Sequence, residues 1–174
     1  MKAMKKVLVS ALAAALVVTA AAPAGAAPSP VKAPKAINGK ATVKGVTVKT
    51  SKKGTATVTA VKSKKATVKV AATIKVKGVT YKVTAIGANA FKNCKKVKKI
   101  SVGKNVKTIG KNAFKGCKKL KTITLANKKV TIKKGAFAGL NTKKITIKAP
   151  KMSKKALKKF KKALKKAGFK GKVK

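Results

Sequence analysis

The chain contains no Asp, no Glu and no His among its 174 residues. Arg, Gln and Trp are also absent, so all 48 basic residues are Lys. General acid–base catalysis, Ser-His-Asp chemistry, carboxylate calcium sites and zinc hydrolase sites all need side chains that are missing here. We therefore predict that the protein is not an enzyme and uses no metal or other cofactor.

The charge of the chain is entirely positive. Its net value is +48, and no Lys has an acidic side chain within the chain to pair with. High net charge with only 3% aromatic residues favours disorder, whereas an apolar fraction of 45% is ordinary for a globular protein. Such a charge also predicts an anionic partner, namely nucleic acid, anionic lipid or an anionic cell-wall polymer.

Residues 1–26 have the pattern of a secretory signal peptide. A Lys-containing start is followed by the apolar, Ala-rich run Val7–Ala22, and small residues precede a predicted cleavage after Ala26. The alternative is an uncleaved membrane anchor, but the run is short and Pro23 follows it. Residues 27–36 are rich in Pro and predict an extended linker. The chain is thus expected to be secreted or displayed at the cell surface.

Residues 37–85 predict a β-strand region. Thr, Val and Ile recur with period two in short runs separated by Gly or by Ser-Lys-Lys, which is typical of antiparallel strands with one buried side. The pair Lys77-Gly78 predicts a tight turn between two strands. The predicted runs are 41–48, 55–61, 66–76 and 79–83.

A repeat with a period of 23 residues occupies residues 86–150. Each copy has an Ile, then an Ala-Phe pair, and ends in a short strand. Phe91, Phe114 and Phe137 recur at this spacing, which favours a core ladder of rings over exposed platforms for nucleic-acid bases. A 23-residue period is typical of leucine-rich repeats, whose rungs stack because one rung cannot bury its apolar side alone.

Residues 151–174 predict a helical cap. Apolar residues of 151–168 fall on one side of a helix and Lys on the other, with Ser153 as a candidate N-cap and Gly168 as a stop. The apolar stripe is expected to close the open end of the repeats. The alternative is a basic amphipathic helix that binds membranes. Phe169–Lys174 is a candidate for one more strand.

The motif Ile-Gly-x-x-Ala-Phe-x-x-Cys-x-x-Leu-x-x-Ile, from Ile109 to Ile123, closely resembles the BspA-like (Treponema pallidum type) leucine-rich repeat. The resemblance covers residues 86–149. It implies a non-catalytic protein that is secreted or surface-displayed and acts in adhesion. The expected fold is mainly β: a short solenoid of three 23-residue rungs, with an N-terminal antiparallel β region and a C-terminal α-helical cap.

Two kinds of side chain in the repeats are candidates for function. Cys94 and Cys117 occupy equivalent positions on successive rungs, so they form either a disulfide, which export permits, or two buried thiols, which we favour. Pairs of Lys recur in successive rungs and are predicted to line up as stripes that bind polyanions. These residues are Lys95, Lys96, Lys118, Lys119, Lys128, Lys129, Lys143 and Lys144.

These observations predict a non-enzymatic surface protein that binds anionic wall polymers or host glycans through distributed Lys. Non-specific polyanion binding needs only Lys, whereas sequence-specific nucleic-acid binding is not expected without Arg or an exposed aromatic surface. One alternative is a cationic membrane-acting or antimicrobial protein that works through residues 151–168. Another is a designed relative of the family with no evolved partner.

Overall fold

The computed structural model describes residues 35–174 apart from Asn93. The predicted signal peptide, its cleavage after Ala26 and residues 27–34 of the predicted linker lie outside the described residues.

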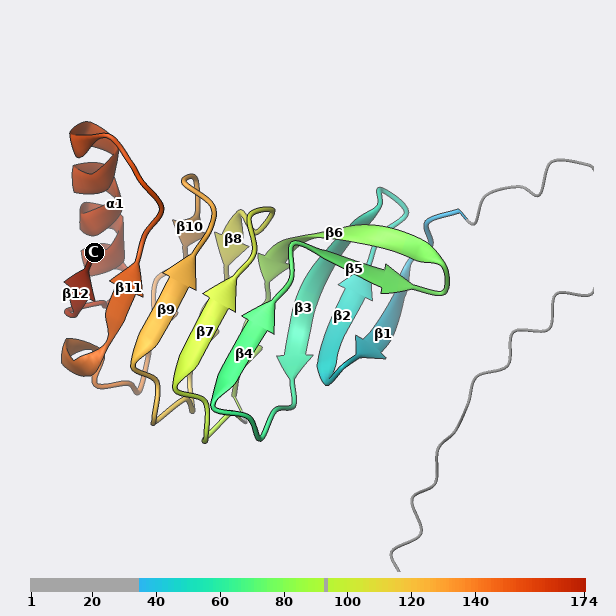
Figure 1. Cartoon of the computed structure of the whole chain (residues 1–174), viewed down its shortest axis with the longest axis horizontal. Helices are drawn as coiled ribbons and strands as arrows, with labels where there is room; N and C mark the ends of the chain where they lie inside the picture. The colour runs from blue at the N-terminus through green and yellow to red at the C-terminus, as the bar shows by residue number, and fades with distance from the viewer. Residues whose placement is uncertain (1–34, 93) are drawn as a thin grey trace, which may run out of the picture. The chain divides into compact units, whose positions relative to one another are not determined.

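The strands form two sheets, here called sheet A and sheet B, which enclose one apolar core (Figure 1). Sheet A has the order β1-β2-β3-β6-β8-β10, and β5 pairs with β6. Its strands are β1 (Gly39–Val43), β2 (Val46–Thr50), β3 (Thr55–Val61), β5 (Thr73–Val76), β6 (Val79–Ile86), β8 (Thr108–Ile109) and β10 (Thr131–Ile132). Sheet B is parallel and consists of β4 (Thr67–Val70), β7 (Lys99–Val102), β9 (Thr122–Leu125), β11 (Thr146–Lys148) and β12 (Lys172–Val173).

Each repeat contributes one strand to sheet B and a short strand to sheet A, so successive rungs stack in register. In sheet B, Ile100 pairs with Ile123, and Ile123 pairs with Ile147. All three side chains are buried. The repeat predicted from the 23-residue period is therefore a solenoid, which confirms the expected mainly-β leucine-rich-repeat class.

The Phe residues of the repeat form a continuous ladder through the core. The ring centroids of Phe91 and Phe114 are 5.5 Å apart, as are those of Phe114 and Phe137. Phe169 extends the ladder, with its centroid 5.0 Å from that of Phe137. All four side chains are buried, so none is available to stack on a nucleic-acid base. The predicted core role of the repeating Phe residues is confirmed.

The N-terminal β region is antiparallel only in part. The pairs β1–β2, β2–β3 and β5–β6 are antiparallel as expected, but β3 pairs with β6 in parallel. The third predicted run, 66–76, is two strands in different sheets. Its first half, β4, pairs in parallel with β7, which places Val68 beside Ile100. The solenoid therefore begins at β4, and the β5–β6 hairpin lengthens its first rung and hides the repeat period.

Two hairpins turn on the same dipeptide. Lys44-Gly45 joins β1 to β2 and Lys77-Gly78 joins β5 to β6. Both residues of each turn have positive φ: 49° and 77° in the first, and 48° and 80° in the second. This is the two-residue turn whose twist matches paired strands, and it normally favours Asn-Gly. The tight turn predicted at Lys77-Gly78 is confirmed, with Lys held in a backbone conformation that costs energy.

The C-terminal cap consists of α1 (Lys154–Lys166) and the strand β12. The helix begins at Ser153, whose Oγ accepts a hydrogen bond from the Ala156 backbone N at 3.3 Å. Phe160 and Leu164 are buried against the core, and the Lys residues of the helix are exposed. Within residues 35–174, Asn93 aside, no helix has the length and apolar character needed to cross a membrane.

Candidate polyanion-binding edge

Three of the predicted Lys pairs lie at one edge of sheet B, where its strands begin. Lys95–Lys96 precedes β7, Lys118–Lys119 precedes β9, and Lys143–Lys144 precedes β11. Each pair is exposed. One Lys of each pair stands four residues before the core Ile of its strand, and these Ile residues pair across the sheet. Parallel register therefore places the three pairs side by side.

A fourth pair at this edge was missed by the sequence interpretation. Lys64 and Lys65 are exposed and precede β4, and Lys64 stands four residues before Val68, the partner of Ile100. The alternation of residues 66–76 predicts one run within an antiparallel region, so it gives no reason to place these two Lys beside the repeats. We call Lys64, Lys65, Lys95, Lys96, Lys118, Lys119, Lys143 and Lys144 together the lysine edge.

Lys128 and Lys129 do not belong to the lysine edge, which corrects their place in the predicted stripe. They lie between the end of β9 and the start of β10, in the turn that leaves sheet B. There the Asn127 Oδ1 atom accepts a hydrogen bond from the Lys129 backbone N at 2.8 Å, which shapes the turn. Both residues are exposed, but β9 separates them from Lys118 and Lys119.

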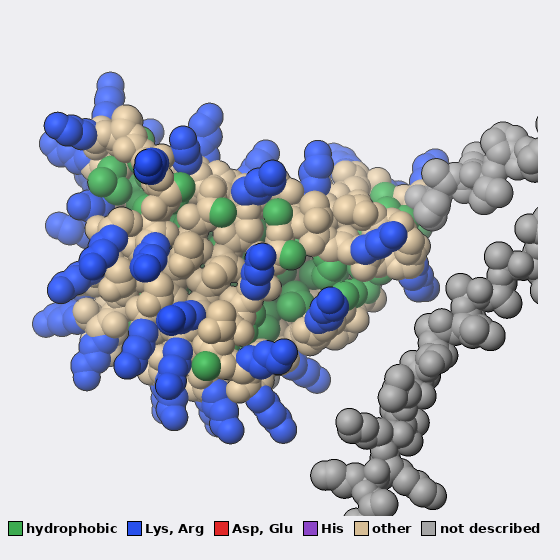
Figure 2. Space-filling model, viewed as in Figure 1, with side chains coloured by type: hydrophobic (Ala, Val, Ile, Leu, Met, Phe, Trp, Pro, Cys, Tyr) green, Lys and Arg blue, Asp and Glu red, His purple; other side chains and the backbone are tan. Residues whose placement is uncertain are grey.

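The lysine edge has a high linear charge density. Adjacent strands of a sheet lie about 4.8 Å apart, so the four rungs from β4 to β11 span about 14 Å. Two Lys per rung correspond to about one positive charge per 2.4 Å, which is comparable to the ~1.7 Å per negative charge of duplex DNA. Figure 2 shows Lys side chains in a row along the edge where β4, β7 and β9 begin, with no acidic side chain among them.

The two Cys residues lie beneath this edge as buried, free thiols. The Cys94 Sγ atom donates to the Val61 carbonyl at 3.2 Å, and the Cys117 Sγ atom donates to the Phe91 carbonyl at 3.5 Å. Burial raises the pKa of the Cys94 thiol. Burial, with a smaller contribution from Cys94, raises the pKa of the Cys117 thiol to about 12. Each thiol thus donates a hydrogen bond to the backbone of an earlier segment and stays protonated at neutral pH. This agrees with the prediction that the two Cys residues are buried thiols.

A hollow of about 140 Å³ opens on the lysine edge between the rung of Lys118 and Lys119 and the rung of Lys144. Its lining includes Lys118, Lys119 and Lys144, together with Cys117 and Leu140. A single anionic group seated there would meet Lys from two successive rungs. The edge therefore offers a concave place for one charge of a longer polymer.

The outer side of sheet B adds hydroxyl groups next to the lysine edge. Thr122 pairs with Lys99 on one side and with Thr146 on the other, and Thr146 pairs with Lys172. None of these side chains belongs to the buried core. Hydroxyls and ammonium groups side by side suit a ligand that carries both hydroxyl and anionic groups, such as an anionic glycan.

The stacked rungs and the spacing of their core residues agree with comparisons to known proteins. The family described as BspA type leucine-rich repeat region (6 copies) matches residues 80–174, which is more than half of the chain. This chain belongs to the BspA-type leucine-rich repeat family. Among curated protein sequences, none shows significant similarity to it.

Two bacterial leucine-rich repeat proteins are among the solved structures that resemble the BspA-type chain. A leucine-rich cell surface protein from Faecalibacterium prausnitzii A2-165 is 26% identical with a TM-score of 0.54, over 62% of this chain and 29% of that one. This chain thus corresponds to less than a third of that protein. A leucine-rich repeat protein from Bacteroides capillosus ATCC 29799 shares the fold, at 22% identity and a TM-score of 0.59, over 78% of this chain and 98% of that one.

Proposed function

We propose that this BspA-type protein is a secreted or surface-displayed, non-enzymatic binding protein that holds linear polyanions along its lysine edge. Anionic wall polymers and anionic host glycans are the linear polyanions that we expect to bind there. The observation that carries the proposal is the alignment of four Lys pairs, one per rung from β4 to β11, in a chain with no acidic side chain to neutralise them. The cell-surface relative from Faecalibacterium prausnitzii supports the location.

The binding mechanism is electrostatic. Closely spaced Lys charges attract a layer of small anions, in the way that DNA phosphates attract cations. A polyanion lying across the strands replaces these small anions, and their release favours binding at low salt. Because each rung repeats the same pair, a polymer with regularly spaced charges gains contacts on several rungs at once.

The binding expected from this edge follows charge and not nucleotide sequence. Phe91, Phe114, Phe137 and Phe169 are buried in the ladder, so they offer no surface for base stacking. The chain also has no Arg for paired hydrogen bonds to guanine. Nucleic acid would therefore compete only as one more polyanion.

The membrane-acting alternative would require the cap to come apart. Phe160 and Leu164, the most buried apolar residues of α1, pack into the solenoid core. Inserting this side of the helix into a bilayer would expose the end of the Phe ladder to water, which costs free energy in proportion to the apolar area exposed. The intact fold leaves the Lys side of the helix, and not its apolar side, for external contacts.

The test is a binding titration of the purified chain. Long-chain polyphosphate and a sulfated glycan are the anionic ligands, and neutral dextran of similar length is the control. At about 0.15 M salt, where charges are screened beyond about 8 Å, we expect binding to both anionic polymers and none to dextran. Logarithmic affinity should fall linearly with logarithmic salt concentration. Equal binding to polyphosphate and dextran, or no dependence on salt, would contradict the proposal.

A further inference from the structure

The two sheets of the solenoid stop at different strands. β3 and β4 form one rung, because β3 pairs with β6 of the next rung and β4 pairs with β7. Sheet A continues past β3 with β2 and β1, whereas sheet B stops at β4 in the described residues (Figure 1). β4 lies in the interior of the chain, between β3 and β5. Its open side is therefore a consequence of the strand order and not of a chain end.

The backbone of β4 leaves this side unpaired. The Lys99 N donates to the Ala66 carbonyl at 3.0 Å, so Ala66 faces β7. Because alternate residues of a strand direct their backbone groups to opposite sides, the N–H and C=O groups of Thr67 and Lys69 point away from β7. In the part of the chain that the structure describes, β7 is the only strand paired with β4. These are the groups that another strand would pair with.

A hollow of about 510 Å³ lies beside the open side of β4, within the range of about 300–1,000 Å³ that is common for ligand sites. Thr67 and Lys69 line it from β4, and the β1–β2 turn and the end of β3 line it from sheet A. Val46, the first residue of β2, also lines it and is only partly buried. Figure 2 shows hydrophobic side chains at the surface over β2 and β3, beside β4. The hollow thus joins an unpaired strand edge to an apolar surface that water reaches.

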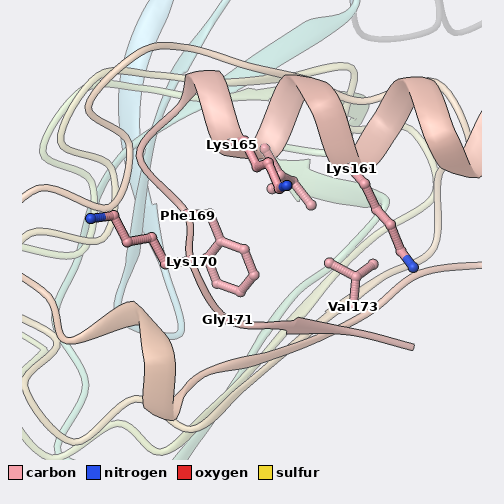
Figure 3. Close-up of a pocket in the computed structure, with 7 residues that line it drawn as sticks. Lys161, Lys165, Phe169, Lys170, Gly171 and Val173 are labelled. Atoms are coloured by element: carbon pink, nitrogen blue, oxygen red, sulfur yellow. The ribbon is translucent and has the colours of Figure 1, made fainter.

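The large apolar side chains of the pocket at the other end of the solenoid are, in contrast, already covered. This pocket has a volume of about 490 Å³ and lies between α1 and β12. Figure 3 shows the Phe169 ring between α1 and the segment that carries Gly171 and Val173. Phe169 and Leu164 are only 2% and 1% exposed, so a ligand there would contact little of either.

Five exposed Lys surround the hollow beside β4 and select its occupant. They are Lys44, Lys62, Lys64, Lys65 and Lys69. Lys on an open strand edge keeps a second copy of a protein from pairing there, and another copy of this chain carries the same net charge of +48. No segment of this chain contains an acidic side chain that could pair with these Lys. The fitting partner is therefore another molecule that is negatively charged and has a backbone that pairs as a strand, which describes an acidic peptide and not a polysaccharide.

We propose that the open side of β4 binds an extended acidic peptide segment of another protein by strand addition. The peptide backbone pairs with Thr67 and Lys69, apolar side chains on one side of the peptide cover Val46, and its carboxylates meet the surrounding Lys. The hollow shares Lys64 and Lys65 with the lysine edge. Strand pairing and the apolar contact do not depend on the polyanion proposal, and each is tested separately from it.

The probe is an acetylated and amidated peptide of sequence Glu-Val-Glu-Trp-Glu-Val-Glu, in which acidic and apolar residues alternate. The protein has no Trp, so Trp fluorescence reports on the peptide alone. On binding to the full chain, we expect a blue shift of the Trp emission as the ring leaves water. The control peptide Glu-Glu-Val-Trp-Val-Glu-Glu has the same composition and charge without the alternation. It should bind several-fold more weakly, because a strand directs alternate side chains to one side.

Backbone methylation of the peptide tests strand pairing on the wild-type protein. One peptide is N-methylated at its three apolar residues, and another at its inner Glu residues. Only one of these sets can face β4, so one methylated peptide should lose binding while the other keeps most of it. If both bound as well as the unmethylated peptide, or if both lost affinity equally, the proposal would be wrong.

Matched variants locate the site on the protein. K44Q/K62Q removes two Lys that line the hollow and lie outside the lysine edge, and K52Q/K53Q removes two exposed Lys of the β2–β3 turn that do not line it. We expect the first to weaken peptide binding about 5-fold and the second to leave it nearly unchanged. T67P removes one outward N–H at the first residue of an edge strand, where Pro is tolerated, and should weaken binding about 5-fold. T67V keeps that N–H and should bind like wild type.

Circular dichroism and melting temperature identify any variant that fails to fold, and the modified peptides test the wild-type chain without any mutation. Equal losses in K44Q/K62Q and K52Q/K53Q would mean that the peptide follows net charge, and the proposal would be wrong. Equal peptide binding by T67P and T67V would also contradict it. T67P should bind polyphosphate as wild type does, so failure of strand addition and failure of the lysine edge give different results.

Discussion

Removing one Lys from each rung of the lysine edge should change how polyanion binding depends on salt. The variant is K64Q/K96Q/K119Q/K143Q, which takes one member of each pair and leaves the buried core residues in place. Each phosphate contact contributes about 0.7 to the slope of logarithmic affinity against logarithmic salt for a single-stranded polyanion. Four lost contacts therefore reduce the slope by about 2.8.

This change in slope is large enough to measure. Between about 0.05 and 0.2 M salt, a slope difference of about 2.8 corresponds to about a 50-fold difference in how much affinity is lost. The assay is fluorescence anisotropy of end-labelled polyphosphate at several salt concentrations in this range. Wild type should lose about 50-fold more affinity across the range than the variant does.

The matched control removes the same charge from another place. K158Q/K159Q/K162Q/K166Q takes four exposed Lys from α1, away from the lysine edge. Its slope should stay close to that of wild type, because these Lys are not aligned across the rungs. If the two variants had the same slope, net charge and not alignment would govern binding, and the reasoning from parallel register would fail.

Three further predictions concern stability. Phe114→Ala, at the centre of the ladder, should lower the free energy of unfolding by about 3–5 kcal/mol in urea titrations, and Phe114→Leu by less. Lys44→Asn and Lys77→Asn should each raise the melting temperature, through a gain of about 0.5–1 kcal/mol, because Asn tolerates positive φ better than Lys; a fall would contradict the turn assignment. The third follows from Cys117, whose pKa is about 12 when folded but near 8.5 in an unfolded chain. The folded state then holds the extra proton, so stability should fall with rising pH, starting near the unfolded pKa, by up to about 1.4 kcal/mol per pH unit. Urea titrations at about pH 8.5 and 10.5 should show a smaller fall for Cys117→Ala than for wild type, and equal falls would show that the thiol is not the cause.

Much of the fold follows from local patterns in the sequence. Alternating Val and Thr predict strands, the 23-residue spacing of Phe91, Phe114 and Phe137 predicts stacked rungs, and the helical spacing of Leu164 predicts the cap. Each of these signals depends on which residues must be buried within one short segment. The absence of acidic residues also determined, without any structure, that the charge stays unpaired by side chains.

The partners of the strands depend on the tertiary structure. β4 has the same alternation as the antiparallel strands around it, yet it pairs in parallel with β7 because Val68 completes the core beside Ile100. That choice brings Lys64 to the lysine edge, while the turn after β9 takes Lys128 away from it. Alternation states which side of a strand is buried, but only competition for the shared core decides which strands lie side by side.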